Sequence, residues 1–297
     1  MRSSEQDLTF NEAKKEFDIR HVKFDIDQMK TLGIMSQDEI YTNLGLLLSD
    51  QCKHTIEVAV FEGKDLNQFK DRKEFSGSVF KQLEDVYEYI DFKNQVHSLF
   101  DKLRRIDRRD YKEVAIREAL LNLIIHREYS YSASAFIRMF KDRIEFTSIG
   151  GLVKGITLKD ITMGVSLCRN EKLANIFYRL ELIEAYGTGI LKIMCAYEGC
   201  IKLPKIEVSD NVFKLTLPNL NVDENEGEYE DKKDNNNSKI EKVMKLARKQ
   251  KSITREDVES LLNISQSSSV RLLKQMIEKR LIVKDGNGKN SRYCLVN

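Results

Sequence analysis

The stretch REALLNLIIHREYS, from Arg117 to Ser130, combines a strongly apolar helix with a line of polar side chains. Glu118, Asn122 and His126 are four residues apart, so on a helix they stack along one face. Leucine and isoleucine fill most of the remaining circumference, as in a helix that is buried on nearly all sides. The aligned carboxylate, amide and imidazole therefore form either a polar edge at a domain interface or part of a binding site.

The composition limits the classes of protein that this chain can form. Its 297 residues are 41% hydrophobic and 32% charged, which is typical of a soluble globular protein with two or three domains. No apolar run approaches the ~20 residues of a membrane span, and MRSSEQDLTF is not a secretory signal. The five cysteines are scattered, without a CxxC pair, which favours reduced thiols. We expect a cytoplasmic protein with no membrane partner.

Charge divides the C-terminal third of the chain. Residues 221–237 hold seven acids against two lysines, and they have too little apolar surface to fix a conformation. Residues 238–297 hold 14 Lys and Arg against six Asp and Glu, a net charge of +8. We predict the following parts: an N-terminal α/β region (1–104), a central domain (105–220), a flexible acidic linker (221–237) and a basic module (238–297).

Hydrophobic periodicity predicts the elements of the central domain. Residues 134–150 are expected to form two antiparallel strands joined at Lys-Asp-Arg, and residues 204–218 alternate like a second strand pair. Helical patterns cover 171–187, where the helix would end at Gly187, and continue from Thr188. Residues 76–103 also have helical periodicity after a Ser-Gly start. The expected class is α+β, a mostly antiparallel sheet with helices on one face.

The last sixty residues have the order helix, helix, turn, helix, hairpin, which is typical of a winged helix-turn-helix. Thr254 is expected to cap the second helix, with Asp257 at its third position. Predicted contacts to bases and phosphates come from the third helix and the wing: Gln266, Ser267, Ser268, Ser269, Arg271, Lys274, Lys289 and Arg292. The partner would be double-stranded DNA. The alternative is a winged helix that mediates only protein contacts.

Four ordered motifs carry a resemblance to a known family. They are REALLNLIIHREYS (117–130), DRIEFTSIGGLVKGIT (142–157), CRNEKLANIFYRLELIEAYGTGILKI (168–193) and PKIEVSDNVFKLTL (204–217). Together they resemble the RecG-like C-terminal domain of bacterial and archaeal transcriptional regulators. That domain is similar in turn to the GHKL ATPases, such as gyrase B, histidine kinases and MutL. The resemblance implies a GHKL-like α/β sandwich over about residues 105–220.

In GHKL ATPases one helix carries a Glu and, four residues later, an Asn. By resemblance, Glu118 positions the attacking water and Asn122 holds Mg²⁺ on the phosphates of ATP. The resemblance implies that the nucleotide also contacts the two glycine boxes, at Ser148, Gly150, Gly187, Thr188 and Gly189. His126 and Arg127 belong to the family's HR-Y signature, where a structural role is expected, and Arg169 or Arg127 would pair with a carboxylate or phosphate.

Two features depart from the family pattern. The adenine-reading Asp of the first glycine box is replaced by Ser148 or Thr147, and neither supplies a carboxylate. A pocket that binds a nucleotide without hydrolysing it, or that binds none, is therefore an alternative. Regulators of this type also begin with a Schlafen/AlbA-type DNA-binding domain ahead of the segment seen here. We expect the winged helix to be the DNA reader within these 297 residues.

Two hypotheses from different classes follow from these features of the sequence. The first is a DNA-binding transcriptional regulator, expected to be a homodimer because most operators have two-fold symmetry. Its GHKL-like domain would sense a ligand or nucleotide or form the dimer. The second is a weak Mg-dependent ATPase that the winged helix recruits to DNA. A P-loop helicase is excluded, because the sequence has no GxxxxGK[ST] motif.

Overall fold

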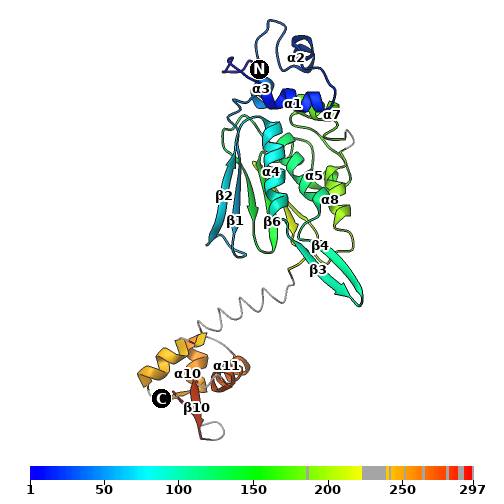
Figure 1. Ribbon diagram of the computed structural model, residues 1–297. Helices are drawn as coiled ribbons and strands as arrows, with labels where there is room; N and C mark the ends of the chain where they lie inside the picture. Colours follow the sequence, from blue (N-terminus) through cyan, green and yellow to red (C-terminus); the bar gives the residue numbers. More distant parts are fainter. Residues whose placement is uncertain are drawn as a thin grey trace. The chain divides into compact units, whose positions relative to one another are not determined.

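The computed structural model describes residues 1–184, 187–222, 239–240, 242–250, 252–262, 265–278, 281–286 and 291–295. The chain divides into two compact units, Met1–Val222 and Asp223–Asn297 (Figure 1). Each unit has its own hydrophobic core among the described residues. The two units are therefore described separately.

A six-stranded mixed sheet forms the centre of the first unit, with the strand order β2-β1-β5-β6-β8-β7. Its strands are β1 (Ile56–Phe61), β2 (Phe69–Phe75), β5 (Ala135–Met139), β6 (Arg143–Ile149), β7 (Lys205–Val208) and β8 (Val212–Pro218). Only β1 and β5 are parallel, and the other neighbours pair antiparallel. The two predicted strand pairs, β5–β6 and β7–β8, are confirmed.

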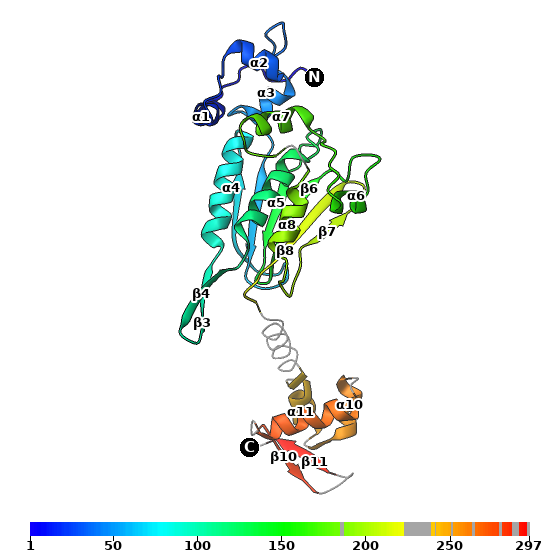
Figure 2. The same cartoon turned by 90° about the vertical axis from the view of Figure 1, so that its right-hand side faces the viewer.

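Helices cover one face of this sheet. The helices that pack there are α4 (Val79–Lys93), α5 (Glu113–Ile125) and α8 (Gly189–Ala196) (Figure 2). In β6 the residues Ile144, Phe146 and Ser148 are buried and alternate with more exposed neighbours, so this strand turns its apolar side toward the helices. The predicted α+β class, with helices on one face, is confirmed.

The helix α5 lies between the sheet and the neighbouring helices. Ile116, Leu120 and Ile124 have no exposed surface or almost none, and nine of its 13 residues are buried. This burial on several sides explains why the stretch is apolar around most of its circumference. The other helices among the described residues of this unit are α1 (Asn11–Ile19), α2 (Ile26–Leu32), α3 (Asn43–Leu48), α6 (Leu158–Thr162) and α7 (Glu171–Arg179).

The predicted boundary at residue 104 does not separate two bodies in the structure. Strands β1 and β2 lie upstream of that boundary, yet β1 pairs with β5 in the central sheet. The first fifty residues also share the core, since the ring of Phe17 contacts Phe80 on α4, and Phe80 stacks on Phe177 of α7. Residues 1–222 form one unit because the sheet needs strands from both sides.

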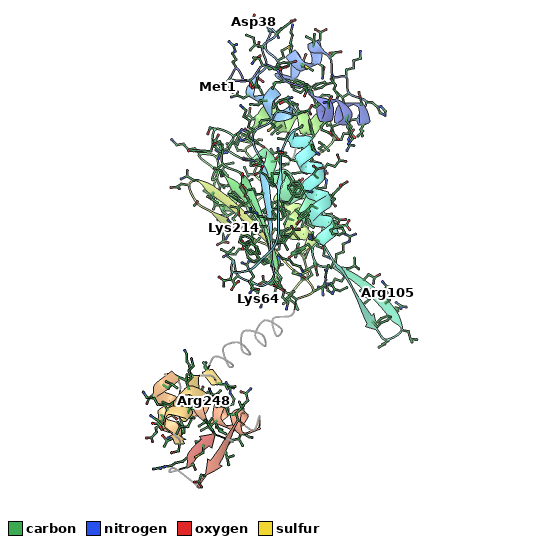
Figure 3. The ribbon with its side chains drawn as sticks, turned by 60° about the vertical axis from the view of Figure 1, so that its left-hand side comes forward. Met1, Asp38, Lys64, Arg105, Lys214 and Arg248 are labelled. Carbon is green, nitrogen blue, oxygen red and sulfur yellow. The ribbon has the colours of Figure 1, made fainter. Side chains whose placement is uncertain are left out.

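The predicted helical pattern over residues 76–103 is correct only for its first part. Ser78 caps α4, which ends at Lys93, and the chain then forms a hairpin from β3 (Val96–Asp101) and β4 (Arg104–Arg109). Figure 3 labels Arg105 on this hairpin. The helix stops because the side chain of Asn94 binds the backbone of Tyr111, donating to its oxygen at 3.1 Å and accepting from its nitrogen at 2.9 Å.

The helix predicted to reach Gly187 also ends early. The last residue of α7 is Arg179, and Glu181 has a φ of 56°, which no α-helix contains. The backbone nitrogens of Leu180 and Leu182 bond back to Ile176 and Phe177. This turn leaves Gly187 in the connection that leads to α8.

The described residues of the second unit form helices and a three-stranded sheet. Its elements are the helical residues 239–240 and 242–250, then β9 (Ser252–Thr254), α10 (Arg255–Leu262), α11 (Gln266–Glu278), β10 (Ile282–Asp285) and β11 (Arg292–Leu295). The sheet order is β10-β11-β9, antiparallel throughout. The predicted cap of α10 is confirmed: Asp257 N donates to Thr254 Oγ1 at 3.3 Å, and Thr254 N donates to Asp257 Oδ2 at 2.7 Å.

No helix within the described ranges is both long and apolar enough to cross a bilayer.

We expect Leu120→Ala to lower the free energy of unfolding of the first unit by about 2–5 kcal/mol, because it leaves a cavity under α5. Val114→Ala is the matched control on the same helix, since Val114 is 51% exposed and should cost less than ~0.5 kcal/mol. Guanidinium unfolding followed by circular dichroism measures both. Equal midpoints for the two variants would contradict the position of α5 in the core.

Candidate functional site

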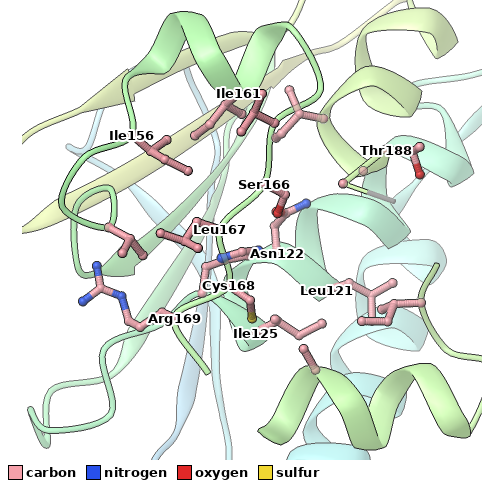
Figure 4. A pocket seen from close by; sticks show the side chains of 18 of the residues that line it. Leu121, Asn122, Ile125, Ile156, Ile161, Ser166, Leu167, Cys168, Arg169 and Thr188 are labelled. Carbon is pink, nitrogen blue, oxygen red and sulfur yellow. The ribbon is translucent and has the colours of Figure 1, made fainter. Parts of the chain in front are cut away.

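The polar edge of α5 lines a cavity rather than a domain boundary. Glu118 and Asn122 are adjacent on this edge, and the side-chain nitrogen of Asn122 donates to the backbone oxygen of Glu118 at 2.8 Å. This bond holds the amide in place and leaves its oxygen available to a ligand. Asn122 and Ser166 both line this cavity (Figure 4).

One oxygen of the Glu118 carboxylate is held by its sequence neighbour. Arg117 Nη1 lies 2.6 Å from Glu118 Oε1, and Arg117 Nη2 donates to the backbone oxygen of Leu182 at 2.6 Å. The guanidinium thus fixes the carboxylate to the segment that follows α7. The other oxygen, Oε2, faces the first residue of α8. A water or a ligand group can be bound by this oxygen.

The start of α8 approaches α5 unusually closely at Gly189. A Cβ atom at this position would lie 3.1 Å from both Glu118 Oε2 and Asn122 Nδ2. Gly187 has a φ of 65°, and a Cβ there would lie 2.8 Å from the Cβ of Ser166. Thr188 makes no side-chain cap, and within the described residues no side chain caps the leading amides of α8, which can bind an anion beside Glu118 and Asn122.

These groups open into a cavity of about 670 Å³, a size typical of sites for nucleotide-sized molecules. Its walls come from α5, from the segment 150–169, from α7 and from α8. Of the residues predicted to contact a nucleotide, those that line it are Glu118, Asn122, Gly150, Gly187, Thr188 and Gly189.

Ser148 was also predicted to contact the nucleotide, but it does not line the cavity. It is buried in β6 and pairs with Phe213 of β8, which does line the cavity. Residues 144, 146 and 148 alternate toward the core, so Ser148 is packed beneath the helices. Neither Ser148 nor Thr147 supplies the carboxylate that the resemblance assigns to this strand.

An ion pair stabilises the wall next to Gly150. Arg169 Nη1 lies 2.6 Å from Glu128 Oε2, and Arg169 Nη2 donates to the backbone oxygen of Gly151 at 2.7 Å. Gly151 itself admits no side chain, because a Cβ would lie 2.2 Å from the oxygen of Ser209. Of the two arginines predicted to pair with a carboxylate or phosphate, Arg169 therefore binds a carboxylate of the chain.

Arg127 has a structural role, as the sequence analysis expected. Its side chain is buried and donates to the backbone oxygens of Thr55 at 2.9 Å and Ala133 at 2.7 Å. These bonds connect the end of α5 to the start of β1 and to the segment before β5. The guanidinium therefore fixes the position of α5 over the sheet.

His126 lines the cavity as a neutral imidazole. Burial lowers the pKa of His126 to about 4, and the nearby charge of Arg169 acts in the same direction. At neutral pH this side chain therefore adds hydrogen-bonding capacity without charge.

The cavity fits Mg²⁺ only as part of a bound nucleotide. No cluster of three or more His, Cys, Asp or Glu side chains that could hold a metal occurs in the part of the chain that the structure describes. The Asn122 oxygen and Glu118 Oε2 are instead the kind of sparse ligand set with which Mg²⁺ binds when phosphates supply other oxygens. The residues present therefore fit a Mg-nucleotide.

The second unit brings together only part of the predicted DNA-contacting set. Gln266, Arg271, Lys274 and Arg292 are exposed, and Ser268 is partly exposed. Ser269 is fully buried, and its hydroxyl donates to Glu259 of α10 at 2.8 Å, so it braces α11 and does not face solvent. Lys289 and the side chain of Ser267 lie outside the described residues.

Three further residues shape the site but were not predicted as site residues from the sequence: Arg117, Glu128 and Gly151. The first two lie within the opening stretch, next to residues that were singled out, but their partners Leu182 and Arg169 are distant in sequence. The doubled glycine at 150–151 was a visible signal, although the oxygen that excludes a side chain comes from the β7–β8 turn.

Residues 133–217 match the family model described as "Putative ATP-dependent DNA helicase recG C-terminal". The matched segment runs from β5 to β8 and includes both glycine boxes, whereas Glu118 and Asn122 precede it. The match supports an ATPase-like domain of the RecG C-terminal type in the first unit. No curated protein matches the chain.

The fold is similar to the crystal structure of the DIP2311 protein from Corynebacterium diphtheriae, with a TM-score of 0.65 and 20% sequence identity. The similarity covers 100% of this chain and 63% of that chain, so this chain spans less than two thirds of its length. At this identity the similarity shows the fold alone.

The lowered pKa of His126 predicts a specific pH dependence. Its pKa is lower in the folded state than the ordinary value of about 6.5, so only the unfolded chain takes up the proton between these values. Stability is therefore complete above pH ~6.5 and falls toward pH 4, by roughly 2–3 kcal/mol for this group.

His126→Asn should flatten the unfolding free energy between pH 6.5 and 4, as measured by urea titration at several pH values. The control is His21→Asn, because His21 is exposed and its φ of 56° suits asparagine. An unchanged pH profile in His126→Asn would show that the imidazole takes up its proton at an ordinary pH.

Proposed function

We propose that this chain is a DNA-binding transcriptional regulator in which the first unit senses a Mg-nucleotide and the second unit binds operator DNA. The observation that carries the proposal is the α5–α8 approach, which gathers Glu118, Asn122 and the free amides of α8 at one end of a cavity. Those groups suit the phosphates of a nucleotide. The proposed assembly is a homodimer, matching the two-fold symmetry of most operators.

The second unit supports DNA binding through its element order and its charge. Helix, strand, helix, helix and hairpin is the order of a winged helix-turn-helix, with α11 as the recognition helix. Arg271 and Lys274 are three residues apart on the exposed side of α11, while Leu272, Leu273 and Met276 fill the core. The net charge of +8 over residues 238–297 favours phosphate contacts over a protein partner.

The cavity supports sensing more strongly than turnover. Glu118 has one oxygen occupied by Arg117, and neither Ser148 nor Thr147 supplies the carboxylate that would read adenine. A nucleotide bound there is held mainly through its phosphates. The specific observation that favours the second candidate, a weak Mg-dependent ATPase, is that Glu118 Oε2 remains available to orient a water beside Asn122.

For the DNA-binding half of the proposal, we expect Arg271→Ala/Lys274→Ala to weaken binding of the full chain to duplex DNA. Each lost phosphate contact should reduce the slope of log K against log salt by about 0.9. Fluorescence anisotropy at several salt concentrations measures this slope. The control is Lys14→Ala/Lys23→Ala, which removes two exposed cations from the first unit. Equal affinity and slope in both variants would contradict a recognition role for α11.

For the nucleotide half, Asn122→Ala should weaken Mg-dependent ATP binding by at least roughly tenfold, because it removes an oxygen that holds the ion. Isothermal titration calorimetry with and without Mg²⁺ measures the loss. Asn175→Ala is the matched control, since Asn175 is another amide that lines the cavity. Absence of ATP binding by the wild-type chain would remove the nucleotide from the proposal.

Phosphate release distinguishes the regulator from the ATPase. The regulator predicts little turnover by the wild-type chain and the same low rate in Glu118→Gln. Substantial turnover that Glu118→Gln abolishes, with DNA affinity unchanged, would favour the ATPase.

A further inference from the structure

The β3–β4 hairpin projects from the sheet and helices of the first unit (Figures 1 and 2). Its two strands pair only with each other, in a register that joins Val96 to Arg109 and Phe100 to Arg105. An isolated two-stranded ribbon is at best marginally stable by itself. None of its residues lines the cavity beside α5.

The base of the hairpin is firmly attached. The mutual hydrogen bonds of Asn94 and Tyr111 close it, and Arg109 Nε lies 3.0 Å from Glu113 Oε1 on α5. The side chain of Asn221 donates to the backbone oxygen of Arg108 at 3.1 Å and to Asp110 Oδ1 at 3.0 Å. The ribbon is therefore oriented by the body and is not a loose loop.

Positive charge dominates the ribbon. Residues 96–109 contain five Lys and Arg against two Asp. Arg105 pairs with Asp107 at 2.7 Å, and Arg109 pairs with acids at the base. Lys102, Arg104 and Arg108 are exposed and form no ion pair with the described residues. Exposed cations at such positions can contact the phosphates of an anionic partner.

The tip and sides of the ribbon also expose apolar side chains. Leu103, at the turn, is 99% exposed, and Phe100 is 75% exposed. Val96 and Ile106 are each about half exposed. Apolar groups this exposed on a slender element are typical of a surface that binds a partner.

We propose that the β3–β4 hairpin binds double-stranded DNA along the minor groove, with Leu103 inserted as a wedge between base steps. Ribbons and arms that enter the minor groove combine cations for the phosphates with an apolar side chain that partly unstacks the bases and bends the duplex. A free leucine at the turn, between Lys102 and Arg104, has this combination. A second copy of the chain is the less favourable occupant, because two such basic ribbons repel each other.

The connection to the second unit starts at the base of the hairpin. Asn221 bonds to that base, and the 16 residues 223–238 lead from there to the helical residues of the second unit.

The test uses the full chain and a mixed-sequence duplex of about 40 base pairs, roughly four helical turns. Arg104→Ala/Arg108→Ala should reduce the slope of log K against log salt by about two and weaken binding at low salt. Leu103→Ser should leave that slope unchanged but reduce DNA bending, measured by energy transfer between dyes on the two duplex ends. All three residues are exposed, and circular dichroism checks that the variants remain folded.

Lys14→Ala/Lys23→Ala is the control of equal charge change, and it should match the wild type in slope and bending. The proposal is overturned if Arg104→Ala/Arg108→Ala matches this control. It is also overturned if the hairpin variants lower the mass of the protein in light scattering while DNA binding is unchanged, since the ribbon would then join copies of the chain.

Comparison with Arg271→Ala/Lys274→Ala separates this inference from the proposed function on which it builds. Loss of affinity in that variant alone leaves the regulator intact and removes the hairpin from DNA binding. Loss in the hairpin variants alone keeps the inference and removes the recognition role of α11. A wild-type chain without affinity for the duplex contradicts both.

Discussion

The close approach of α8 to α5 at Gly189 is the constraint on which the rest of the first unit depends. A Cβ atom at Gly189 would lie 3.1 Å from Glu118 Oε2 and from Asn122 Nδ2, so a larger residue there would press on the two polar side chains of the site. The helix α5 is fixed over the sheet by its buried leucines and by Arg127. Glu118 and Asn122 would therefore have to turn away from the start of α8, where an anion would bind. Glycine at position 189 keeps both side chains beside the start of α8.

The charges of this site largely balance one another. Glu118 is paired with Arg117, and Arg169 with Glu128, while His126 is neutral because burial lowers its pKa. A ligand therefore meets oriented dipoles, the amide of Asn122 and the start of α8, next to charged side chains that are largely paired with one another. Such dipoles amount to about half an elementary charge at a helix start. They suit reversible binding of an anionic effector, in agreement with a sensor.

The proposed DNA-contacting surfaces follow a different physical rule. Arg271 and Lys274 on α11, and Arg104 and Arg108 on the hairpin, lie at exposed positions where water screens their charge. Phosphate contacts gain free energy through counterion release and need little shape complementarity. They can therefore be placed on slender or separately folded elements, whereas the cavity requires the close-packed core.

Local pattern by itself determined the strand pairs, the helix α5 with its polar edge, the cap at Thr254 and Asp257, and the basic C-terminal unit, because each depends on neighbours within a few residues. Only the tertiary structure decided that β1 completes the central sheet, that α4 stops at Lys93, and that Ser148 and Ser269 point into cores. Those outcomes depend on partners far away in the chain, such as β5 for β1 and Tyr111 for Asn94. The same holds for the candidate site. The stretch REALLNLIIHREYS shows which polar residue types the site contains. The packing that makes this polar helix edge a cavity wall involves Gly189, which is more than sixty residues away.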